Sequence, residues 1–124
     1  MATTDNLKAA FAGESQANRT YLAFAKKADA EGMKQIARLF RAAAAAETVH
    51  ALSHFRVMGG VKGTIDNLQA AIAGEGHEFK EMYPKFLDEA CAENNRAAQG
   101  ELKPTPPNVR FDTTAASSTG FAVA

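Results

Sequence analysis

The sequence Ala43-Ala-Ala-Ala-Glu47-Thr-Val-His50 lies inside a long alanine-rich run that contains neither glycine nor proline. A spacing of three places Glu47 and His50 one turn apart on the same face of a helix. Extending that face by threes and fours reaches apolar residues at Met33, Ile36, Phe40, Ala44 and Val57. A carboxylate and an imidazole in an apolar stripe are costly to bury unless something neutralises them, and a metal ion is the usual partner. The stretch therefore predicts a helix that carries metal ligands.

Two long helices are predicted on either side of Gly32. The first runs from the N-terminal residues to about Glu31, and the second covers about Met33–Met58. The first helix has apolar residues at helical spacing, and Glu14 occupies a core position among them. In an antiparallel hairpin, Glu14 and Glu47 are nearly equidistant from the turn. At about 1.5 Å per residue the two carboxylates would therefore lie at the same height.

A third helix is expected after the glycine-rich connector Gly59–Gly63. Thr64 is a candidate N-cap, and an apolar stripe follows it at helical spacing. Glu75 and Glu78, again three residues apart, interrupt that stripe. Pro84 stands within the same run and predicts a kink, because proline cannot donate a hydrogen bond inside a helix.

The character of the chain changes after Gln99. The segment from Gly100 is rich in proline and then in small polar residues, with no helical periodicity. We therefore expect one all-α domain over residues 1–99, with three long helices, and an irregular or disordered tail over residues 100–124.

The overall composition is that of an ordinary globular protein. The chain has 124 residues, 46% hydrophobic and 23% charged, and a formal net charge of zero. Neutral charge gives no indication of binding to nucleic acid or to an anionic membrane. A single cysteine, Cys91, excludes an intrachain disulfide and any Cys-x-x-Cys metal site. With no apolar leader or long apolar run, we expect a cytoplasmic protein without a membrane segment.

An internal repeat relates the first and third predicted helices. Ala10-Phe-Ala-Gly-Glu14 parallels Ala71-Ile-Ala-Gly-Glu75 at an offset of 61, whereas Tyr21 aligns with Tyr83 at an offset of 62. One extra residue between the two matches predicts a π-bulge beside the carboxylates, a feature common at functional sites.

The same repeat predicts a second Glu-x-x-His on a fourth helix. An offset of 62 carries Glu47 and His50 to Val109 and Asp112, so the predicted second motif is absent from this sequence.

Five side chains therefore converge on predicted core stripes: Glu14, Glu47, His50, Glu75 and Glu78. A single helical glutamate is usually solvated, but a cluster at matching heights would repel itself without a cation. Carboxylates combined with imidazole suit iron or manganese.

Other polar side chains near these positions have simpler interpretations. His54, one turn beyond His50, favours a supporting or surface role over ligation, and His77 points away from the glutamate face. Tyr21 and Tyr83 are either core aromatics or hydroxyl groups that hydrogen-bond a ligand carboxylate or a bound oxygen species.

Four motifs in order resemble the ferritin-like di-iron domain of rubrerythrins over about Asn6 to Gln99: Gly13-Glu14, Glu47-Thr-Val-His50, Gly74-Glu75-Gly-His-Glu78 and Glu81-Met-Tyr-Pro84. The resemblance implies a four-helix bundle, a non-haem site with two irons, and reduction of hydrogen peroxide by electrons from a rubredoxin-like donor. It assigns the four glutamates and His50 as iron ligands, with manganese or zinc as possible substitutes, and Tyr21 and Tyr83 as the tyrosines near the irons.

Two features depart from the family pattern. The sequence has no paired Cys-x-x-Cys of a rubredoxin domain, so it resembles the short members and implies a separate electron donor. The family's last helix, with its own Glu-x-x-His, has no counterpart after Gln99, and an altered or frame-shifted C-terminus is one explanation. Three helices cannot close a four-helix bundle, so we expect a homodimer, with exchanged helix pairs as one arrangement.

Three functions follow from these features as alternatives. The first is a di-iron peroxidase of oxidative-stress defence. The second is an iron-binding or iron-handling protein with an incomplete site and little turnover. The third is a metal-free helical interaction module with solvent-facing glutamates.

Overall fold

The computed structural model describes residues 1–106, and these residues are helical with short connections and no strand. The chain divides into two compact units, Met1–Val61 and Lys62–Ala124, which are described separately here. The predicted all-α class is confirmed. Within the described residues, no helix is both long enough and apolar enough to cross a membrane.

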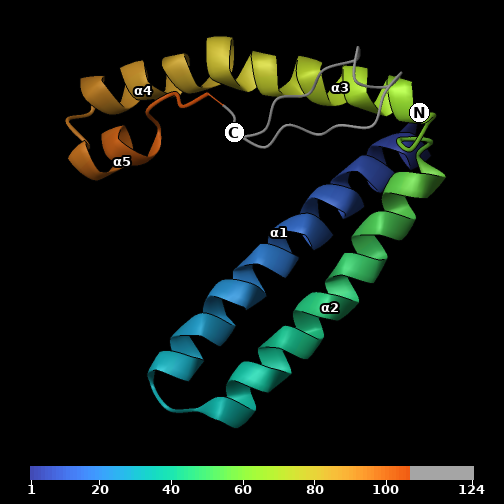
Figure 1. The fold of residues 1–124 in the computed structure, drawn as a ribbon, viewed down its shortest axis with the longest axis vertical. Coiled ribbons are helices and arrows are strands. Elements are labelled where there is room, and N and C mark those ends of the chain that lie inside the picture. The colour runs from blue at the N-terminus through green and yellow to red at the C-terminus, as the bar shows by residue number, and fades with distance from the viewer. Residues whose placement is uncertain (107–124) are drawn as a thin grey trace, which may run out of the picture. The chain divides into compact units, whose positions relative to one another are not determined.

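The first unit is an antiparallel hairpin of two long helices, α1 (Ala2–Ala30) and α2 (Lys34–Val57), which lie side by side (Figure 1). The buried positions of α2 are alanines that recur every seven residues: Ala37, Ala44 and Ala51. A seven-residue repeat keeps one stripe of a helix against its partner. Because these positions carry only a methyl group, the backbones of α1 and α2 can approach closely.

The buried face of α2 differs from the predicted one. Ala44 and Phe40 lie on the inner side as expected, but Met33, Ile36 and Val57 are about half exposed or more. The stripe that packs on α1 is rotated toward the alanines. Met33, Ile36 and Val57 lie on a neighbouring flank of α2, so their predicted place on the packed face is wrong.

The turn between α1 and α2 is a Schellman motif centred on Gly32, as its sequence position predicts. Gly32 has a φ of +78°, and the Met33 amide donates to the Ala28 carbonyl at 2.8 Å while the Gly32 amide donates to Asp29. A salt bridge of 2.7 Å between Arg41 and Asp29 joins the two helices near this end.

The second unit is built on a long helical segment that changes its winding. It begins as α3 (Thr64–His77), passes through the π-helical turn η1 (Glu78–Met82), and continues as α4 (Tyr83–Ala92) (Figure 1). The predicted π-bulge is therefore present, and it lies between Glu75 and Tyr83 where the internal repeat gains one residue. Pro84 follows directly in the first turn of α4, where the hydrogen-bond register has just changed.

A short helix, α5 (Arg96–Glu101), follows a turn that the sequence analysis did not predict. Asn94 adopts a left-handed φ of 56°, and the Asn95 side chain caps α5 by accepting from the Ala98 amide at 3.1 Å. α5 therefore includes the first two residues, Gly100 and Glu101, of the segment predicted to be an irregular tail. Most of the predicted tail, and the positions Val109 and Asp112, lie outside the described residues.

Candidate metal centre

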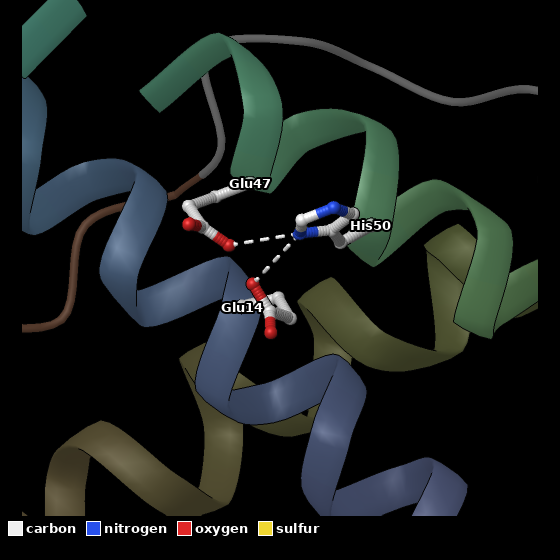
Figure 2. Close-up of side chains that lie close together, drawn as sticks. All are labelled: Glu14, Glu47 and His50. Atoms are coloured by element: carbon white, nitrogen blue, oxygen red, sulfur yellow. Dashed lines mark hydrogen bonds and ion pairs between the residues drawn. The ribbon is translucent and has the colours of Figure 1, made fainter. Parts of the chain in front are cut away.

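Three of the five predicted ligands come together in the middle of the α1–α2 hairpin. Figure 2 shows Glu14 on α1 pointing toward Glu47 and His50 on α2. His50 Nδ1 lies 3.2 Å from Glu47 Oε2 and 3.6 Å from Glu14 Oε2. The heights of Glu14 and Glu47 along the hairpin therefore match, as their equal distances from the turn predict.

The spacing of these atoms suits coordination of one ion. One ligand atom from each of Glu14, Glu47 and His50 lies within 4.8 Å of the others. Metal-to-ligand distances of about 2.1 Å separate neighbouring ligand atoms by about 3.0 Å in octahedral and about 3.4 Å in tetrahedral geometry. The observed separations of 3.2 and 3.6 Å fall close to these values. Two carboxylates and one imidazole form a donor set that suits iron.

The three side chains differ in exposure. The side chains of Glu14 and Glu47 are 31% and 21% exposed, so both carboxylates are partly withdrawn between the helices. The His50 side chain is 56% exposed, because it lies on the flank of α2 rather than on the alanine stripe. The site therefore opens toward one side of the hairpin.

A hydrogen-bond network next to the cluster fixes how α1 and α2 align. Asn18 Nδ2 donates to the Ala44 carbonyl at 2.8 Å and contacts Thr48 Oγ1 at 2.7 Å. Asn18 lies one turn beyond Glu14, and Thr48 directly follows Glu47. These bonds therefore hold the two carboxylates at the same height. The sequence analysis missed this role, although a polar Asn18 within the apolar stripe of α1 was the available signal.

Tyr21 lies one heptad away from the cluster along α1. Its ring packs with those of Phe24 and Phe40, at centroid distances of 6.5 and 6.2 Å. The arrangement is that of a partly buried aromatic cluster. His54 is also partly buried, and it is not part of the group of ligand atoms around His50.

The remaining predicted site residues belong to the second unit. Glu75, Glu78 and Tyr83 line a pocket of about 400 Å³, together with Phe79 and side chains from residues 101–106. Both glutamates are exposed, and Tyr83 is partly buried. His77 is exposed and lies 3.0 Å from Glu81, which agrees with its predicted position off the glutamate face.

An all-α fold in which two long helices bring a glutamate and a Glu-x-x-His motif together agrees with the ferritin-like class of helical proteins. Comparison with known proteins agrees, because the family model described as Rubrerythrin matches residues 5–103. The chain belongs to the rubrerythrin family.

Several curated proteins are similar to the chain. It is 40% identical to Rubrerythrin-2 of Clostridium acetobutylicum, covering 78% of this chain and 60% of that protein. It is 41% identical to Nigerythrin of Nitratidesulfovibrio vulgaris, with 77% and 54% covered, and 33% identical to a putative rubrerythrin of Methanocaldococcus jannaschii, with 82% and 60% covered. The chain thus spans little more than half the length of these relatives. Membership of the rubrerythrin family supports iron binding by this chain.

Proposed function

We propose that this chain is a rubrerythrin-type oxidoreductase that reduces hydrogen peroxide at an iron site built on Glu14, Glu47 and His50. The contacts of His50 Nδ1 with both carboxylates, at 3.2 and 3.6 Å, are the observation that carries this proposal. The reaction takes two electrons and two protons to convert one peroxide into two waters. A separate rubredoxin-like protein is the proposed electron donor.

Bound iron would supply the electron transfer and the polarisation of the oxygen–oxygen bond. The residues of the chain have other tasks. Glu14 and Glu47 balance the positive charge of the metal, and Asn18 keeps the two carboxylates aligned by bonding to α2. The exposed side of His50 leaves an approach for a small substrate such as peroxide.

Glu75, Glu78 and Tyr83 remain part of the proposal as the residues that the family resemblance assigns to the iron site. Their common pocket supports this assignment, since it gathers two carboxylates and a phenol around one space. Of the two tyrosines, Tyr83 is the better candidate for donating a hydrogen bond to a ligand carboxylate, because Tyr21 packs among phenylalanines. A homodimer and a cytoplasmic location complete the proposal.

The second candidate function is iron binding with little turnover. It is favoured by the single Glu-x-x-His motif, Glu47 to His50, because complete helical di-iron sites use two such motifs. The two candidates share the same ligands and differ in the reaction.

The experiment that tests the proposal measures iron content and peroxide consumption of the full chain after anaerobic loading with Fe²⁺. We expect peroxide to oxidise the bound iron rapidly, with sustained consumption when a reduced rubredoxin is added. Iron binding with no consumption above that of free Fe²⁺ would select the iron-handling function. Absence of any iron binding would contradict both and favour the metal-free helical module.

A further inference from the structure

We infer that residues 101–106 form a strap over Glu75 and Glu78, and that Lys103 on this strap is the positive charge that neutralises the two carboxylates until iron replaces it. The strap is then a latch, which must move aside before iron binds to these glutamates. This inference rests on the proposed function, because it takes Glu75 and Glu78 as iron ligands.

The turn after α4 directs the strap back along its own unit. Asn94 has a positive φ of 56°, and the Asn95 amide donates to the Ala90 carbonyl at 3.0 Å. The Gln99 side chain donates to the same carbonyl at 3.2 Å, which fastens α5 to the end of α4. The chain that leaves α5 runs back in the direction from which α4 came (Figure 1). The strap therefore returns along the helical segment that carries the two glutamates.

The strap and the helical segment line one pocket of about 400 Å³ between them. The lining residues are Glu75, Glu78, Phe79 and Tyr83 from the helical segment, and Glu101, Lys103, Thr105 and Pro106 from the strap. Proline at positions 104 and 106 favours an extended strap, because its ring fixes φ and removes the amide hydrogen that a helix needs. Five extended residues reach about 16 Å, whereas Glu75 to Tyr83 span about 12 Å of helix. The strap is therefore long enough to pass both glutamates.

Lys103 is the one cationic side chain among the residues that line this pocket, beside the carboxylates of Glu75, Glu78 and Glu101. Glu75 and Glu78 lie one helical turn apart, so their like charges repel each other. The lysine ammonium sits on a flexible four-carbon stem and can serve either carboxylate. Charges within one such pocket are separated by no more than about the Debye length of 8 Å, so salt screens their attraction only in part. Lys103 therefore reduces the repulsion between the two glutamates when metal is absent.

The latch is weak enough for iron to open it. Glu75, Glu78 and Lys103 are all exposed, and attraction between exposed charges contributes little to stability. Iron carries twice the charge of an ammonium and coordinates carboxylate oxygens directly, so it binds the glutamates more tightly than Lys103 does. The metal and the ammonium also repel each other within one pocket. Iron binding at Glu75 and Glu78 is therefore expected to displace Lys103 and to release the strap.

The first test couples amines to neighbouring carboxylates with a carbodiimide in the full 124-residue chain, without metal and after anaerobic loading with Fe²⁺. We expect mass spectrometry to find Lys103 joined to Glu75 or Glu78 in the metal-free chain, and this cross-link to be lost after iron loading. Lys85 is the internal control, because it is exposed on α4 and does not line the pocket. Its cross-links should not depend on iron. A metal-free chain without the Lys103 cross-link, or a cross-link that iron leaves unchanged, would overturn the inference.

Two matched lysine variants test the competition between Lys103 and iron. Lys103→Gln and Lys85→Gln each remove one positive charge from an exposed position of the second unit, but only Lys103 lines the pocket. Lys103→Gln is expected to tighten Fe²⁺ binding by about two- to fivefold, the factor that corresponds to loss of an exposed ion pair. Lys85→Gln should leave the affinity of the parent chain unchanged. Equal iron affinities of the two variants would overturn the inference.

The double variant Glu75→Gln/Glu78→Gln separates this inference from the function on which it rests. Weaker iron binding in the double variant, together with no effect of Lys103→Gln, would leave the proposed iron site standing and remove the latch. Iron binding as tight as in the parent chain would contradict the assignment of Glu75 and Glu78 to the iron site and, with it, the latch.

Discussion

The helix α1 and the helical segment of the second unit repeat the same sequence motif but place their glutamates in different surroundings. Glu14 faces a second helix, where Glu47 and His50 meet it across the hairpin. Glu75 and Glu78 are exposed on one helical segment, beside Tyr83 and residues 101–106. A repeated motif thus supplies the carboxylate, but the partner helix decides whether a cluster forms.

The two repeats also differ in winding. α1 is an uninterrupted α-helix of 29 residues, whereas the second repeat contains the π turn Glu78–Met82. The extra residue widens one turn and re-aims the side chains that follow it. Tyr83 consequently lines a pocket with Glu75 and Glu78, while Tyr21 packs with Phe24 and Phe40. The same position of the repeat therefore places Tyr21 in an aromatic cluster and Tyr83 in a pocket lined by two glutamates.

The largest expected effect is on iron binding, and it comes from comparing the removal of His50 in the first unit with the removal of His77 in the second. Each lies close to a glutamate, His50 at 3.2 Å from Glu47 and His77 at 3.0 Å from Glu81, but only His50 also contacts a glutamate of another helix. His50→Ala is expected to weaken iron binding by about 100-fold or more. Loss of a residue that only hydrogen-bonds a metal ligand already lowers metal affinity by up to about 100-fold, and His50 is proposed to be a ligand itself.

His77→Ala provides the matched control for this comparison. It removes an exposed histidine that contacts only Glu81, and iron affinity should stay within about twofold of the parent chain by titration, as for a surface substitution. Equal losses in both variants would show that iron is not held by the cluster in the hairpin.

The second prediction concerns the close contact of α1 and α2. Ala44 is 1% exposed and its carbonyl accepts from Asn18. Ala44→Leu forces a larger side chain between two closely spaced backbones, and we expect a loss of about 2 to 3 kcal/mol in the free energy of unfolding. Ala45→Leu, at an exposed position of the same helix, should change stability by less than about 0.5 kcal/mol. Denaturant titration of both variants checks this difference, and equal stabilities would mean that α2 packs through another face.

The third prediction tests the network that aligns the two helices. Asn18→Ala removes the bonds to the Ala44 carbonyl and to Thr48, and we expect a loss of about 1 to 2 kcal/mol in unfolding free energy. Iron affinity should fall as well, because Glu14 and Glu47 lose their fixed alignment. Thr48→Val keeps the bond from Asn18 to the Ala44 carbonyl and should lose less in both measurements. A network that only stabilised the hairpin would change its melting temperature and leave iron affinity unchanged.

The sequence predicts those features that local chemistry determines. Gly32 and Gly59 end helices because each adopts a positive φ, and the equal distances of Glu14 and Glu47 from the turn place them together. The extra residue in the second repeat predicts the π turn, because a π turn takes up one residue more than an α-helical turn. These features depend on spacing within one or two elements, which a single sequence contains.

Features that depend on the partner surface could not be predicted in the same way. α2 has apolar residues on two flanks, and periodicity alone does not say whether Ile36 or Ala37 faces α1. In the structure the alanine side faces α1, and the Asn18 bond to the Ala44 carbonyl crosses this close contact. The turn at Asn94 was missed because asparagine signals a left-handed residue less strongly than glycine. The sequence signal for this turn was the pair Asn94-Asn95, because Asn94 ends α4 and the Asn95 side chain caps α5.

The smallest expected effects are the changes in stability caused by substitutions in the turns that end α1 and α4. Gly32 and Asn94 occupy the same place in two Schellman motifs, with φ values of +78° and 56°. Gly32→Ala puts a β-carbon into a left-handed conformation and should cost about 1 kcal/mol. Asn94→Gly removes such a strain and should stabilise the second unit by no more than about 0.5 kcal/mol, since the glycine also makes the unfolded chain more flexible.

Hydrogen exchange measured separately for amides of α1–α2 and of α3–α5 distinguishes these two effects. Each substitution should change protection mainly in its own unit, because the two turns belong to different compact units of the chain. Gly32→Ala would then lower the protection of the hairpin amides while those of α4 and α5 keep their values. A uniform change of all amides in either variant would mean that the two units unfold together, and the hairpin would then owe part of its stability to the second unit.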